Sequence, residues 1–126
     1  RTKTTMQIAY EAAFEAFMAK KAWNPYDKLA HVDMSKRIFK QIVEKDPENI
    51  EYRFLRLSMN HHLPSFLQET RWLEEDKAKL YHHFTQPDLD GSLEWNAYIL
   101  RFLLDKKLFT PLQEEKLKII YESMIK

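Results

Sequence analysis

A single glycine, Gly91, stands in a chain of 126 residues, and this scarcity constrains the fold more than any other sequence feature. Two-residue β-hairpin turns favour glycine because their central residues adopt positive φ, so hairpin-rich all-β folds are disfavoured. Glycine-rich loops that hold phosphate groups need several such positions and are excluded. The chain also lacks cysteine, which excludes disulfides, Cys-ligated zinc and a thiol nucleophile.

The prolines indicate where helices begin. Proline is tolerated in the first helical turn because its missing N–H would have no intrahelical partner there. Three prolines follow a good N-cap residue and precede an apolar pattern of helical period, at Asn24-Pro25, Asp46-Pro47 and Thr110-Pro111. Gln113 lies at capping-box spacing from Thr110, as does Gln68 from Ser65, just after Pro64. We therefore predict helix starts at these four places.

The segments between these starts carry apolar residues at a helical period, and none alternates in the manner of a strand. In the first segment one side carries Met6, Tyr10, Ala13, Phe17 and Met18, and Phe14 broadens this stripe, which we expect in the core. Five long helices are expected over about residues 4–21, 26–45, 47–60, 71–84 and 93–107, with a short helix or turn at about 65–69 and a last helix over about 111–125. The predicted fold class is all-α, as a single helical domain over residues 1–126.

The charges are balanced and interspersed. Twenty Lys and Arg against nineteen Asp and Glu leave a formal charge of +1, without the basic stripe that nucleic-acid binding requires. No apolar stretch is long enough to span a membrane. The chain begins at Arg1 rather than Met, a start that signal-peptide removal or cloning would produce. We expect neither a nucleic-acid partner nor a membrane-spanning segment.

Two adjacent histidine pairs, His61-His62 and His82-His83, are the candidate metal ligands. Neighbouring residues of a helix point about 100° apart, so each pair offers one convergent ligand. Carboxylate partners would come from the acids Glu69, Glu74, Glu75 and Asp76. Both pairs lie near predicted helix C-termini, where imidazole suits the helix dipole. We therefore expect capping or surface roles, with a metal site as the alternative, and no cofactor.

The segment from Asp88 to Glu94 resembles the centre of an EF-hand calcium loop. With Gly91 at the sixth loop position, Ala97 occupies the twelfth, where calcium needs a bidentate glutamate. We interpret the segment as a turn, with Asp90 or Ser92 capping the next helix.

A polar stripe of Arg53, Arg56 and Asn60 follows an otherwise apolar helix. Arginines on a covered helix face need partners, because an unpaired charge is costly to bury. We expect one acid of the run Glu74-Glu75-Asp76 to turn inward and pair with Arg53 or Arg56. The open alternative is that the two arginines bind a carboxylate or phosphate in a cleft.

No recognisable nucleophile is present, because no serine lies in a Gly-x-Ser-x-Gly elbow. A hydrolase that uses a carboxylate pair is the remaining catalytic hypothesis. We predict that the chain is not an enzyme, and we assign no catalytic residue.

Part of the chain resembles the tetratricopeptide repeat (TPR). Ser35, Phe39 and Pro47 match its spacing of small residue, large residue and proline, and Asp46-Pro47-Glu48-Asn49 resembles its inter-repeat turn. The resemblance implies that five long helices plus one short helix form antiparallel pairs in a right-handed, TPR-like arrangement.

Residues 10–84 are also similar to an uncharacterised family of small bacterial helical proteins. The similarity lies in the segments Ala22 to Leu29, Asp46 to Arg56, Pro64 to Leu67 and Leu73 to Lys77. Members commonly begin with an export signal, which implies a periplasmic or envelope-associated location; a cytoplasmic location is the alternative. The resemblance supplies no catalytic residue.

We therefore expect a protein–protein interaction module or an accessory subunit of a bacterial envelope complex. The surface to test is a groove between the predicted second and third helices and segment 61–76, with binding candidates Asn24, Lys28, Arg53, Arg56, Glu75 and Asp76. The alternative is a small-ligand or metal-binding protein that uses Arg53, Arg56 and the paired histidines.

Overall fold

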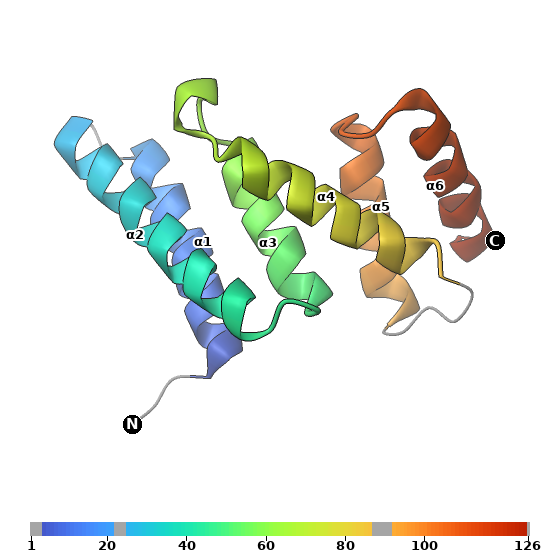
Figure 1. The fold of residues 1–126 in the computed structure, drawn as a ribbon, viewed down its shortest axis with the longest axis horizontal. Coiled ribbons are helices and arrows are strands. Elements are labelled where there is room, and N and C mark those ends of the chain that lie inside the picture. The colour runs from blue at the N-terminus through green and yellow to red at the C-terminus, as the bar shows by residue number, and fades with distance from the viewer. Residues whose placement is uncertain (1–3, 22–24, 87–91, 126) are drawn as a thin grey trace. The chain divides into compact units, whose positions relative to one another are not determined.

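The structure is a computed structural model that describes residues 4–21, 25–86 and 92–125, without the side chains of residues 15–27. Within these ranges the chain is all-α and contains no strand, as the sequence predicts (Figure 1). The elements are α1 (Thr5–Lys21), α2 (Pro25–Lys45), α3 (Ile50–His61), the 3₁₀ helix η1 (Ser65–Leu67), α4 (Thr70–Phe84), α5 (Leu93–Asp105) and α6 (Pro111–Met124). None of these helices is long and apolar enough to cross a membrane. Within the described ranges, six α-helices and one short helix correspond to the six long ranges and the short one that the apolar period predicts, one long helix more than the five counted for the TPR-like arrangement.

Several predicted helix starts are confirmed. Thr110 and Gln113 form a capping box, in which each side chain accepts a hydrogen bond from the backbone N–H of the other, and Pro111 occupies the first turn. Ser92 caps α5 by accepting from Trp95 N, and α2 begins at Pro25. Polar N-caps satisfy backbone N–H groups that have no partner inside the helix.

One predicted start is wrong, and one predicted cap does not form. Asp46-Pro47 does not cap α3; Asn49 does, because its Oδ1 accepts from Tyr52 N at 3.0 Å. Pro47 instead lies in a turn closed by the bond from Asn49 N to Asp46 O. The short helix η1 does begin at Ser65, as predicted. The expected capping box between Ser65 and Gln68 is absent, and the Gln68 amide donates to the backbone oxygens of His61 and Leu63.

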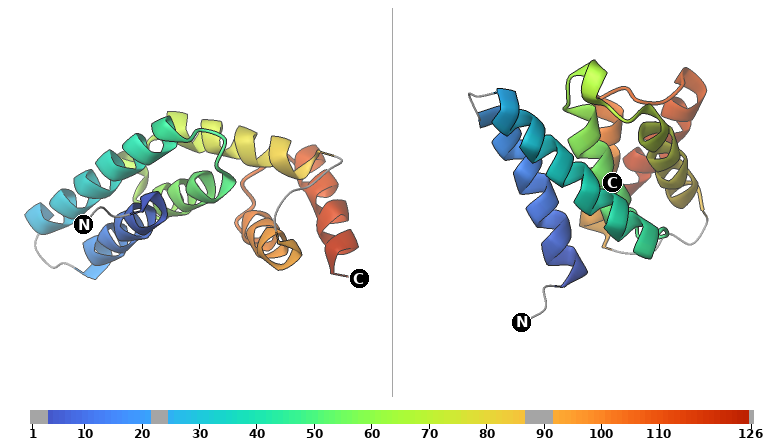
Figure 2. Two further views of the ribbon diagram at one scale, coloured as in Figure 1. Left: turned by 90° about the horizontal axis from the view of Figure 1, so that it is seen from below. Right: turned by 60° about the vertical axis from the view of Figure 1, so that its left-hand side comes forward.

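The chain divides into two compact units, Arg1–Asp76 and Lys77–Lys126, and the single domain stays a prediction. In the first unit α1 packs antiparallel along α2, and all three views in Figures 1 and 2 agree on this. Helix α3 contacts both of them and also the beginning of α4. Neighbouring helices therefore pair as predicted, whereas the right-handed TPR-like arrangement stays a prediction.

Small residues bring α1 and α2 close together. Ala9, Ala12 and Ser35 are fully buried, and Ser35 Oγ donates to Ala12 O at 2.8 Å. This contact places Ser35 at the helix–helix position that its TPR-like spacing suggested. Around it lies the core of the first unit, formed by Val32, Phe39, Ile42, Val43, Tyr52, Met59 and Leu63.

In the second unit α5 packs antiparallel with α6 (Figure 1). Its buried apolar residues are Leu80, Phe84, Ile99, Leu100, Leu103 and Leu117. After α5 the chain turns through Lys107, whose φ of 54° lies in the left-handed region that favours glycine. The helix end therefore forms without the glycine that commonly occupies this position.

Candidate functional site

The predicted ion pair forms between α3 and the start of α4, and Asp76 is the acid that turns inward. Arg56 holds its carboxylate with two hydrogen bonds, from Nε to Oδ2 and from Nη2 to Oδ1, both 2.8 Å. Arg53 Nη1 donates to the same Oδ1 at 3.0 Å. Asp76 is 0% exposed and both arginines are buried, so α3 and α4 are joined by a desolvated ionic cluster.

Two further groups complete this cluster. Glu75 Oε1 lies 3.6 Å from Arg56 Nη2 and 3.9 Å from Arg53 Nη1, at the half-exposed edge. The Arg56 guanidinium also lies 4.4 Å from the centre of the Trp72 ring, a cation–π contact. Two arginines and two acids together carry no net charge, so the cluster has no positive charge left over for an anionic ligand.

The Asp76 carboxyl experiences two opposing effects. Burial raises its pKa, while hydrogen bonds and positive charge from Arg56 and then Arg53 lower it. Protonation would leave two buried guanidinium groups without a counter-charge, so we assign the ionised form at neutral pH.

Asn60 extends the polar stripe by one helical turn. Its Nδ2 donates to Glu69 O at 2.8 Å, and its Oδ1 accepts from Glu69 N at 2.9 Å. The Glu69 side chain reaches back to α2, where Lys36 Nζ donates to it at 3.1 Å. The polar stripe seen in the sequence therefore holds α3 to the segment after it. No sequence pattern identifies this partner of Asn60, because the partner is a backbone group.

The predicted binding residues are not all surface groups. Arg53 and Arg56 are buried against Asp76, and Arg53 Nε also donates to Pro47 O. Lys28 and Glu75 are exposed, whereas Asn24 lies outside the described residues. A role in binding stays a prediction for all six candidates, and a cleft between the two arginines would first require Asp76 to leave them.

The histidines occupy the helix ends, as the sequence predicts. His62 is the C-cap residue of α3, and its Nδ1 lies 2.7 Å from Ser58 O. His61 lies in the last turn of α3, and His82 and His83 in the last turn of α4. The described residues contain no group of three or more His, Asp and Glu side chains that would hold a metal ion. Residues 87–91 of the calcium-loop resemblance lie outside the described part of the chain.

The expectation that Tyr10 and Phe14 belong to the core is wrong. Their exposed fractions are 49% and 58%. At the close α1–α2 contact Ala9 and Ala12 are buried, whereas Tyr10 and Phe14 lie on the exposed side of α1. The periodic pattern did not reveal this, because it cannot distinguish small residues that face the core from large ones beside them.

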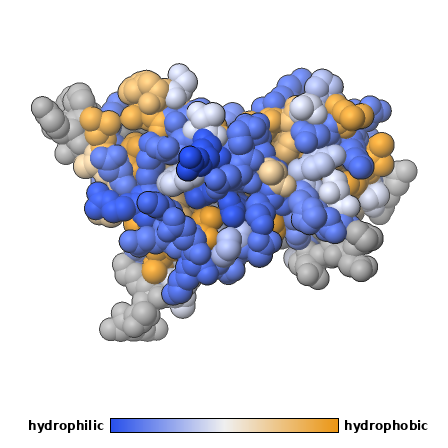
Figure 3. All heavy atoms as spheres, viewed as in Figure 1, coloured by the Kyte–Doolittle hydropathy of each residue, from blue (hydrophilic) through white to orange (hydrophobic). Residues whose placement is uncertain are grey.

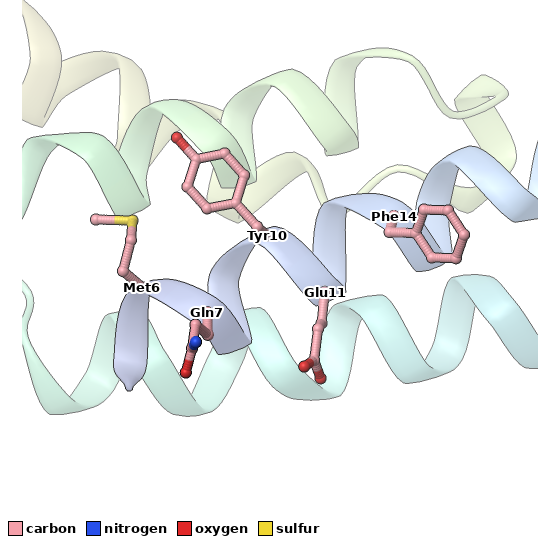
Figure 4. A pocket seen from close by; sticks show the side chains of 5 residues that line it. All are labelled: Met6, Gln7, Tyr10, Glu11 and Phe14. Atoms are coloured by element: carbon pink, nitrogen blue, oxygen red, sulfur yellow. The ribbon is translucent and has the colours of Figure 1, made fainter. Parts of the chain in front are cut away.

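These side chains surround an open cavity of about 500 Å³, lined by Met6, Gln7, Tyr10, Glu11 and Phe14, which we call the α1 face. Met6, Tyr10 and Phe14 follow one another at intervals of one helical turn, and Gln7 and Glu11 lie on the other side of the helix from Tyr10 (Figure 4). The Tyr10 hydroxyl reaches α3 and donates to Glu51 Oε2 at 3.2 Å. Its burial and the neighbouring Glu51 charge raise the pKa of Tyr10.

The side of the protein drawn in Figure 3 is mostly hydrophilic, with smaller apolar patches between the polar side chains. Isolated exposed apolar residues are common, whereas Met6, Tyr10 and Phe14 lie next to one another, so we take the α1 face as a candidate binding surface. The α1 face is therefore the site that sequence reasoning missed.

Comparison of the chain with protein-family models, with curated proteins and with solved structures gives no match.

Proposed function

We propose that this chain is a non-enzymatic protein-interaction module, an accessory subunit of a bacterial envelope complex. The observation that carries this proposal is the α1 face, where exposed Tyr10 and Phe14 lie beside an open hollow while Ala9 and Ala12 of the same helix are buried. Side chains such as Tyr and Phe contribute most to protein interfaces when a partner removes them from water. The envelope location is supported by the resemblance of residues 10–84 to small exported bacterial proteins.

The polar groups of the first unit support the same proposal. In the described residues no buried side-chain nitrogen or oxygen lacks a hydrogen-bond partner. The Arg53–Arg56–Asp76 cluster is satisfied internally, which is the expected pattern of a structural cluster. We infer that it fixes the shape of the scaffold and that binding takes place at the surface.

Site-specific photo-crosslinking in the native cells tests this function. A photoreactive phenylalanine analogue replaces Phe14 in one variant and Met34 in a control, whose exposed fraction is 43% on α2. We expect a discrete protein adduct from position 14 that position 34 does not give, identified by mass spectrometry. Equal adducts from both positions, or none from position 14, would refute the proposal.

Thermal melts distinguish the small-ligand or metal-binding alternative. A ligand that binds only the folded state raises the melting temperature by mass action. Under the proposed function, divalent metal ions and anionic metabolites leave the melting temperature unchanged. A rise that disappears in Tyr10→Ser or in His62→Ala would assign the chain to the alternative class.

A further inference from the structure

Glu51 gives the α1 face an acidic edge. It lies in the first turn of α3, where the helix dipole favours a negative charge, and it is half-buried. The Tyr10 hydroxyl is its hydrogen-bond donor. Among the described residues, no Lys or Arg lies within ion-pair distance of the Glu51 carboxylate. Burial raises the pKa of Tyr10, and the Glu51 charge adds to this effect.

The shape of the α1 face suits a helix. Met6, Tyr10 and Phe14 form a ridge of the i, i+4, i+8 kind, about 12 Å long at 1.5 Å per residue. Ridges of this kind pack into the grooves of a second helix. An extended strand would gain no main-chain hydrogen bonds here, because the described part of the chain has no sheet edge.

We propose that the α1 face binds an amphipathic, basic helix of a partner protein, whose apolar side chains pack along the ridge and whose lysine or arginine pairs with Glu51. This inference rests on the proposed function. A cation in that position also lies beside the Tyr10 ring, so that an ion pair and a cation–π contact act together. The short ridge favours a helical segment over a second folded copy, since stable interfaces bury about 1,200–2,000 Å².

A displayed library of helical peptides tests this inference and requires no identified partner. The library fixes apolar residues at i, i+4 and i+7 and randomises the positions between them. Selection uses the whole chain, with counter-selection against Phe14→Ser, an exposed position where substitution leaves the core intact. We expect enriched peptides to carry Lys or Arg at one position adjacent to the apolar stripe.

Binding of the enriched peptides is then measured by fluorescence anisotropy. Tyr10→Ser and Phe14→Ser are expected to weaken binding by about tenfold or more, as buried aromatic contacts do. Glu51→Gln keeps an acceptor for Tyr10 but removes the charge, so affinity falls severalfold and its dependence on salt decreases. The matched control Met34→Ser, also an exposed apolar residue, leaves binding unchanged.

Three results would overturn the inference. The first is that no peptide is enriched over the counter-selection, and the second is that the enriched peptides are acidic or uncharged. The third is that a peptide binds Phe14→Ser and Met34→Ser equally well. Concentration-dependent dimerisation that Phe14→Ser abolishes would assign the face to a second copy. A crosslinked partner at position 14 that presents no basic helix would refute this inference alone, and the proposed function would stand.

Discussion

The two units of this protein bury different kinds of side chain. The described part of Arg1–Asp76 buries five polar or charged residues, namely Ser35, Arg53, Arg56, Asn60 and Asp76. In the described part of Lys77–Lys126, Asn96 is the buried polar residue, and the remaining buried side chains are hydrocarbon. Apolar packing is non-directional, whereas hydrogen bonds to a buried carboxylate fix one geometry.

The difference shows how each unit is stabilised. In the first unit α3 is joined to the start of α4 by groups that must all be present, because removing one leaves the others buried without a partner. In the second unit α5 and α6 are held by side chains whose contributions follow the apolar area that they bury. Substitutions in each unit test this contrast, and those that should change stability most come first.

Asp76→Ala should destabilise the protein most, by about 3–5 kcal/mol, because two buried guanidinium groups lose their counter-charge. Urea denaturation gives the loss, and amide hydrogen exchange should place it in α3. Glu75→Ala, which removes the half-exposed acid, should cost less than about 1 kcal/mol. Replacing Arg53, Arg56 and Asp76 together by Met, Leu and Leu should recover most of the loss. A triple variant as unstable as Asp76→Ala would contradict the ionic explanation.

Leu117→Ala should destabilise the second unit by about 3 kcal/mol, since Leu117 is fully buried and its truncation leaves a cavity. The same denaturation experiment measures this, and exchange should increase in α5 and α6 first. Ile119→Ala, on the exposed side of α6, is the control and should change stability by less than about 0.5 kcal/mol. Increased exchange spread equally over both units would show that their cores are not separate.

Lys107→Gly should stabilise the protein by about 1 kcal/mol, because glycine adopts the left-handed conformation without a steric penalty from Cβ. A higher denaturation midpoint with an unchanged m-value is the expected readout. Lys106→Gly is the matched control, since Lys106 has φ −83° and gains nothing from glycine. Equal effects of the two substitutions would exclude the backbone explanation.

The smallest expected effect is that of Tyr10 ionisation on the stability of the folded chain at alkaline pH. The pKa of Tyr10 is higher in the folded chain than the ordinary value of 10.0, so its contribution is fully present below that pH and is lost as the pH rises through the folded pKa. The absorbance of tyrosinate, compared between the wild type and Tyr10→Phe, isolates its titration. Glu51→Gln should lower this pKa, and an unchanged titration would show that the Glu51 charge does not act on Tyr10.

Local rules were sufficient where a residue and its neighbours in sequence decide the structure. The Thr110–Gln113 capping box and the histidines at the helix ends depend on backbone groups within one helical turn, so the sequence predicts them. The helix start predicted at Asp46-Pro47 was wrong because the same residue types also favour a turn, and Asn49 is the residue that caps α3. The requirement for a partner of Arg53 and Arg56 was also predictable, since the cost of burying a charge is general.

The helical class of this chain follows from its sequence alone. The single glycine, the prolines that follow N-cap residues and the 3.6-residue period of the apolar residues leave no other class. The need of the two arginines for an acid follows from the sequence as well. Tertiary packing was required to select Asp76 as this acid, to bind Asn60 to the backbone of Glu69, and to turn Tyr10 and Phe14 toward water. The first two outcomes depend on how α3 packs against the start of α4, and the third depends on how closely α1 approaches α2. That distance is set by small residues such as Ala12 and Ser35, which touch in the fold although they lie far apart in the sequence.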